Sequence, residues 1–163
     1  MKKALAAVAA AVVAIPLLGA SAALAYDDSS IPECYPACAG ANLHNWNAEQ
    51  KRMPGGDFSG ANMSKASFWK TEFQGSDLSG VNGYKVDLRK ASLAGVNLSG
   101  ADLTKAKLKN ANLVGADLTG ANLTKANLKD ANLTGADISG ANFTGAKFKS
   151  TTCPDGHRTN SRC

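Results

Sequence analysis

A strict repeat of five residues dominates the chain. From Gly56 to Asp155 the sequence divides into twenty consecutive blocks without a break in register, beginning GDFSG, ANMSK, ASFWK and ending ANFTG, AKFKS, TTCPD. A period of five matches neither the 3.6-residue period of a helix nor the two-residue alternation of a strand. The repeat therefore predicts a solenoid in which each block is one structural unit.

Two of the five positions in each block are apolar. The third residue is Phe, Leu, Met or Ile in eighteen of the twenty blocks, and the first residue is mostly Ala. A small and a large apolar residue two positions apart predict two inward-pointing side chains per block around a narrow core. The exceptions at the third position are Gly83 and Cys153. At Gly83, either neighbouring side chains fill the gap, or the Asn82-Gly83 pair marks a turn that breaks the coil.

The last residue of each block repeats with a period of twenty. Two glycine columns are Gly60, Gly80, Gly100, Gly120, Gly140 and Gly75, Gly95, Gly115, Gly135. The other two columns are Lys65, Lys85, Lys105, Lys125 and Lys70, Lys90, Asn110, Asp130, Ser150. Four blocks per turn predict a four-sided prism, with glycines at corners of positive φ. At about 4.8 Å per coil, five coils make a rod roughly 24 Å long.

These blocks resemble the pentapeptide-repeat family. Its motif is Ala, Ser, Thr or Val, then Asp or Asn, then Leu or Phe, then a small polar residue, then often Gly, and it covers residues 56–155 here. The resemblance implies an all-β fold, a right-handed quadrilateral parallel β-helix of about five coils. It implies no single activity, since members of the family serve different partners.

The N-terminus predicts export. Lys2 and Lys3 precede an apolar run over 4–18 and then Ala23-Leu24-Ala25, which is typical of a signal peptide over residues 1–25. The run is short for a membrane span, and an uncleaved anchor is the alternative. We therefore expect a periplasmic or extracellular protein.

Four cysteines agree with an oxidising compartment. Cys34 and Cys38 precede the repeat, and Cys153 and Cys163 follow at its far end. Because a disulfide needs Cα atoms within about 7 Å, the predicted rod allows only the local pairs Cys34–Cys38 and Cys153–Cys163.

We expect a cap at each end of the rod. Residues 26–55 form the expected N-terminal cap, in which Ala41-Asn42-Leu43 keeps the repeat frame before "HNWNAEQKRMPGG" interrupts it. Residues 156–163 form the expected C-terminal cap. Trp46 is interpreted as a packing residue of the first cap, with a binding role as the alternative.

No enzyme signature is found in the sequence. Six of the eight aspartates within residues 56–155 lie at the second position of a block, where repetition explains them. There is no nucleophile with a nearby base, no phosphate-binding loop and no zinc spacing. We therefore predict no catalytic residue, no cofactor and no metal, and we expect no small-molecule substrate.

Positive charge gathers on one side of the predicted prism. Without Lys2 and Lys3 the chain has 16 cationic and 13 acidic residues, a net charge of +3. Twelve of the cations share one side: Lys65, Lys70, Lys85, Arg89, Lys90, Lys105, Lys107, Lys109, Lys125, Lys129, Lys147 and Lys149. The opposite side contains four aspartates and no cation within the repeat.

This distribution predicts a noncatalytic exported scaffold or binding module. Its basic side would contact a protein or an anionic polymer of the cell envelope. The alternatives are a purely structural soluble rod, an ice-binding protein using the row of Thr104, Thr124 and Thr144, or an inhibitor that mimics nucleic acid. A bound nucleic acid is not expected.

Overall fold

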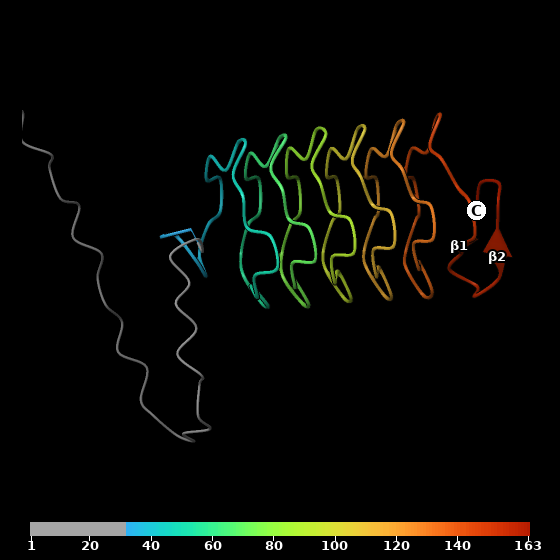
Figure 1. The fold of residues 1–163 in the computed structure, drawn as a ribbon, viewed down its shortest axis with the longest axis horizontal. Coiled ribbons are helices and arrows are strands. Elements are labelled where there is room, and N and C mark those ends of the chain that lie inside the picture. Colours follow the sequence, from blue (N-terminus) through green and yellow to red (C-terminus); the bar gives the residue numbers. More distant parts are fainter. Residues whose placement is uncertain (1–31) are drawn as a thin grey trace, which may run out of the picture.

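The chain forms a rod of stacked square coils. The computed structural model describes residues 32–163 and shows a right-handed quadrilateral β-helix, with the coils side by side along the rod (Figure 1). The predicted signal peptide, residues 1–25, lies outside the described residues. No helix between residues 32 and 163 is long and apolar enough to cross a membrane.

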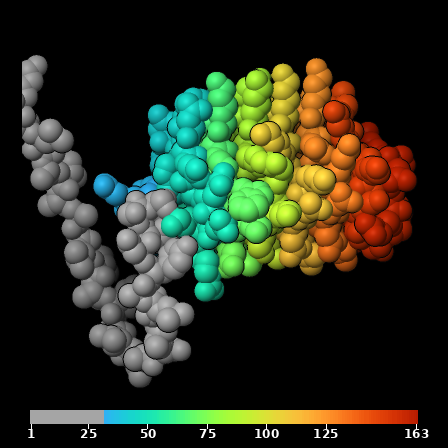
Figure 2. Space-filling model, in the orientation of Figure 1, coloured from blue at the N-terminus to red at the C-terminus, as the bar shows by residue number. Residues whose placement is uncertain are grey.

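The coils are joined by parallel pairing with a constant offset of twenty residues. The second residue of each block pairs with the equivalent residue of the next coil, from Ala37↔Asp57 to Asn132↔Thr152. Within each block, the N–H groups of the third and fifth residues donate to carbonyls of the next coil, as in Leu103 N to Asn122 O (2.8 Å). In the space-filling view, each coil packs directly against the next along the rod (Figure 2).

The solenoid begins earlier in the chain than the repeat pattern predicts. Residues 36–55 do not interrupt the repeat, because Asn42, Asn47 and Arg52 pair in register with the following coil. These blocks depart from the motif, but they still form a coil because Ala48 and Met53 occupy the third, inward position, where both are fully buried. The solenoid therefore spans 36–155 and has six coils, not five, and the N-terminal cap is shorter than residues 26–55.

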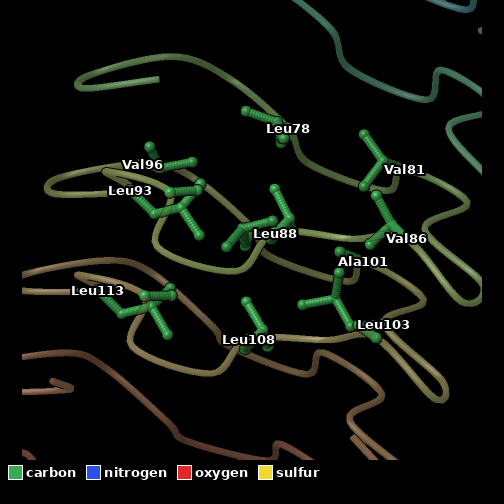
Figure 3. Close-up of a cluster of buried hydrophobic side chains, with 14 of the residues drawn as sticks. Leu78, Val81, Val86, Leu88, Leu93, Val96, Ala101, Leu103, Leu108 and Leu113 are labelled. Atoms are coloured by element: carbon green, nitrogen blue, oxygen red, sulfur yellow. The ribbon is translucent and has the colours of Figure 1, made fainter. Parts of the chain in front are cut away.

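The core is a column of side chains from the first and third positions. Alanines or valines alternate with leucines, and the leucines stack in register from one coil to the next (Figure 3). Where threonine replaces alanine at the first position of a block, its buried hydroxyl donates a hydrogen bond to a main-chain carbonyl. Thr71 donates to the carbonyl of Ala48 (2.6 Å), and Thr151 donates to that of Leu128 (2.8 Å).

Gly83 does not break the coil. Its N–H donates to the carbonyl of Asp102 (2.8 Å), so the ladder continues. A Cβ at this position would lie 3.0 Å from Leu103 Cδ2 and 3.2 Å from Val86 Cγ1. The neighbours therefore fill the space of the missing side chain, and the turn interpretation is wrong.

The side chain at the second position of most blocks stabilises the turn that follows it. Asp102 Oδ1 accepts the Thr104 N–H at 3.0 Å, and Asn122 Oδ1 accepts the Thr124 N–H at 3.1 Å. Short Asn and Asp side chains form such local turns readily. The regular carboxylates are therefore explained by the turn that follows each of them.

Both ends of the rod have a small cap with a disulfide. Cys34–Cys38 and Cys153–Cys163 have Cα separations of 4.9 and 5.5 Å, and this is the predicted local pairing. At the N-terminal end, Tyr35 packs on Phe58 with ring centroids 6.3 Å apart. At the other end, β1 (Thr151–Thr152) and β2 (Arg158–Thr159) pair antiparallel (Figure 1).

Candidate binding face

The twelve cations predicted to share one side do so in the structure. The third side of each coil consists of blocks 46–50, 66–70, 86–90, 106–110, 126–130 and 146–150, and the parallel pairs stack these blocks directly. We call this side, with its two bordering corners, the lysine face. The column Lys65, Lys85, Lys105 and Lys125 forms one corner and is exposed throughout.

The corners of the lysine face have an unusual backbone. Eleven non-glycine residues between 32 and 163 have positive φ, and all of them lie at these two corners: Asn45, Gln50, Lys65, Lys70, Lys85, Lys90, Lys105, Asn110, Lys125, Asp130 and Ser150. The corners on the opposite side contain glycine at φ values such as 61° for Gly80 and 70° for Gly140. A left-handed conformation costs an L-residue roughly 1–2 kcal/mol. The fold therefore retains side chains on this side where glycine would be less strained.

One carboxylate is embedded among the cations. Asp87 is 7% exposed, accepts from Arg89 Nη2 at 2.7 Å, and lies 3.3 Å from Lys107 Nζ. Burial would raise the pKa of Asp87, but the hydrogen bonds from Arg89 and the charge of Lys107 outweigh it and hold this pKa below its usual value. Two of the twelve cations are therefore paired internally.

Aromatic rings lie among the lysines. Lys70 Nζ is 4.4 Å from the ring centroid of Trp69, and the Nζ atoms of Lys85 and Lys105 are 5.2 and 5.6 Å from that of Tyr84. The hydrogen bond from Lys105 lowers the pKa of Tyr84, and Lys85 adds to this effect. The repeat pattern alone did not predict that these rings belong to the face. The signal was available, since each ring directly precedes a corner lysine.

Trp46 also lies on this side but packs inward. Its ring contacts Phe68 edge-on at 5.8 Å and is half-buried. This agrees with a packing role, although within the first coil rather than in a cap. Trp69, by contrast, has its ring in contact with a cation, Lys70.

The opposite side has the reverse charge. Asp57, Asp77, Asp117 and Asp137 stack there, and no cation lies in its blocks between residues 36 and 140. The N–H and hydroxyl of Ser59 hold the pKa of Asp57 below its usual value, and the hydroxyl and N–H of Ser139 do the same for Asp137. The rod is therefore electrically two-sided.

The predicted threonine row uses its hydroxyls internally. Thr104, Thr124 and Thr144 each donate to the Asp or Asn two residues earlier, at 2.6, 2.6 and 2.7 Å. Residues 32–163 contain no group of three or more His, Cys, Asp or Glu side chains that could hold a metal ion.

Comparison with known proteins identifies the repeat. The profile for Pentapeptide repeats, with eight copies, matches residues 38–80, 84–120 and 111–149. The chain belongs to the pentapeptide-repeat family. Pentapeptide-repeat proteins are generally noncatalytic structural or binding modules. A search of curated proteins found no match to this sequence.

Solved pentapeptide-repeat proteins have the same fold. One from the cyanobacterium Cyanothece 51142 is 24% identical with a TM-score of 0.59, covering 71% of this chain and 90% of its own. Another from Nostoc PCC 7120 is 39% identical with a TM-score of 0.50, covering 57% and 84%. A third, from the thylakoid lumen of Arabidopsis thaliana, is 29% identical with a TM-score of 0.50, covering 62% and 67%.

Proposed function

We propose that this protein is an exported, noncatalytic binding module whose lysine face holds an anionic polymer or the acidic surface of a protein partner. The observation that carries the proposal is the placement of lysines at left-handed corners. The two corners of the opposite side show that glycine suits the same turn. A residue kept at a conformational cost is commonly kept for what its side chain does.

The arrangement suits an extended partner. Corner lysines recur once per coil from Lys65 to Lys125, a span of about 14 Å at 4.8 Å per coil. The acidic residues of this side are few, and the best buried of them, Asp87, is already neutralised by Arg89 and Lys107. A bound polyanion would therefore meet a largely uncompensated row of positive charge.

Export is supported by two observations. The N-terminal residues have the pattern of a signal peptide, and both disulfides are of the kind that persists in oxidising compartments. A pentapeptide-repeat relative occurs in the thylakoid lumen, which is also outside the cytosol. Detection of the mature N-terminus at Tyr26 in an envelope or culture fraction tests this part of the proposal.

Binding is tested with an acidic polysaccharide, anionic lipid vesicles and duplex DNA at low and moderate salt. We expect the acidic polysaccharide to bind with an affinity that falls steeply as salt increases. A triple variant with Lys85, Lys105 and Lys125 changed to Glu should lose at least tenfold in affinity, whereas the matched Arg variant should keep it.

Two results would overturn the proposal. The first is a wild-type protein that binds none of the three polyanions. The second is a triple Glu variant, shown by its melting curve to be folded, that binds as well as the wild type. Either result leaves a structural rod whose lysines serve solubility.

A further inference from the structure

The C-terminal end of the rod is only partly capped. In coils one to five, the third and fifth residues of each block donate to the next coil. In coil six, residues 157–160 cover only the last side and its corner: Cys153 N donates to His157 O at 2.8 Å, and Ser150 N donates to Asn160 Oδ1 at 2.8 Å. The hairpin of β1 and β2 lies at this end of the rod (Figure 1).

The rest of this edge has free main-chain groups. The N–H groups of Phe143, Gly145 and Phe148 have no partner within residues 32–163, whereas the equivalent groups one coil earlier donate to coil six. The carbonyl of Ala146 is likewise without a partner in that part of the chain. Such an edge is a template for another strand.

A groove runs along this edge. It has a volume of about 800 Å³ and lies between residues 143–149 of coil six and residues 160–162 of the tail. Phe143 and Phe148 form an aromatic pair in it, with ring centroids 5.6 Å apart. The charged residues that line it are all cations: Lys129, Lys147, Lys149 and Arg162.

We propose that this groove binds an extended acidic peptide segment of another protein, which adds to the rod as a strand of a seventh coil. Peptide carbonyls would accept from the N–H groups of Gly145 and Phe148, and a peptide N–H would donate to Ala146 O. Apolar side chains of the peptide would pack on Phe148, and acidic ones would meet Arg162 and its neighbours. This is strand addition with charge selection at the rim.

The tail that forms the second wall is fixed covalently. Arg162 is directly followed by Cys163, which is bonded to Cys153 in the last block of the solenoid. The disulfide therefore holds Arg162 beside the strand edge. Opening this disulfide would release the wall without changing residues 143–149.

The probe is a blocked six-residue peptide of alternating Val and Asp, labelled with a fluorophore. We expect it to bind and to protect the amides of Gly145 and Phe148 from hydrogen exchange. A peptide with Lys in place of Asp should not bind. A peptide N-methylated on its hydrogen-bonding edge should bind at least about tenfold more weakly, because its lost backbone hydrogen bonds contribute to the affinity.

The variant Arg162→Glu should weaken the Asp peptide about fivefold or more, since it reverses one rim charge while leaving the edge intact. The inference is independent of the proposed function, because the variant of Lys85, Lys105 and Lys125 leaves the groove unchanged and should still bind the peptide. If the N-methylated peptide binds equally well, or if protection appears in the earlier blocks of the lysine face, residues 66–130, and not at Gly145 and Phe148, strand addition is excluded. Self-association of the chain that blocks the peptide would also overturn the proposal, since the edge would then be occupied by a second copy.

Discussion

Replacing Lys65 and Lys125 with glycine should stabilise the rod. Both lysines lie at a corner with φ of 58°, and coil six has Gly145 at φ of 68° in the same column. Neither side chain forms an ion pair or stacks on an aromatic ring within residues 32–163, so the substitutions remove strain without breaking such contacts.

The size of the effect follows from two opposing contributions. Release of an L-residue from the left-handed region is worth roughly 1–2 kcal/mol. Glycine loses about 0.5–1 kcal/mol of this through its greater freedom in the unfolded chain. The net gain is about 0.5–1 kcal/mol per site. Because the two sites are three coils apart, about 14 Å, their effects should add to about 1–2 kcal/mol.

The assay is urea unfolding together with a melting curve at moderate salt, where repulsion between lysines is screened. The gain corresponds to a rise in Tm of about 2–8 °C for a chain of this size. The matched control replaces Gly60 and Gly120, which have φ of 64° and 66° on a glycine corner, with Lys. That control should lose a similar amount. A lower Tm for the glycine variant, or no loss in the control, would refute the argument from backbone strain.

Three further predictions concern single sites. Gly83→Leu should destabilise the fold by about 1–3 kcal/mol through overpacking against Leu103, and a higher Tm would show that a void exists there. Because the folded-state pKa of Asp87 is lowered, its stabilisation is complete above its ordinary pKa of 3.8 and is lost as pH falls through the lowered value. In the variant Asp87→Asn, the free energy of unfolding should therefore fall less between pH 7 and pH 2 than in the wild type. An equal fall in both proteins would contradict the ion pairs with Arg89 and Lys107. Loss of the C-terminal disulfide should cost about 0.8 kcal/mol more than loss of the N-terminal one, because it closes the longer loop, and single Cys-pair variants in urea would show the reverse order if this is wrong.

The interior of the rod was predictable from sequence because it depends on two positions per block. Leu103 and its equivalents are both the repeat signal and the core, so pattern and packing contain the same information. The local disulfides followed from the same geometry, since a rod separates its ends. The grouping of the lysines on one side likewise needed only the period of twenty.

The first coil and the end groove were not predictable in the same way. Residues 46–55 depart from the motif, yet main-chain pairing tolerates many side chains at the outward positions, so a weak pattern still folded as a coil. The groove depends on which edge groups the tail reaches, and this is decided by the path of residues 156–163. No period in the sequence describes that path. The backbone strain at the lysine corners could not be predicted either. The motif has glycine at the fifth position, and it does not show that a lysine there adopts the same positive φ.

The closure of each coil after twenty residues constrains how the length of this rod can change. An added or deleted segment of twenty residues would leave every block on its own side. A change of five residues would turn all later blocks by a quarter of a revolution relative to the earlier ones. Lysine blocks beyond the change would then continue a neighbouring column, and the single basic surface would become two shorter ones at right angles. The rod can therefore lengthen or shorten without losing its electrical sidedness only by whole coils.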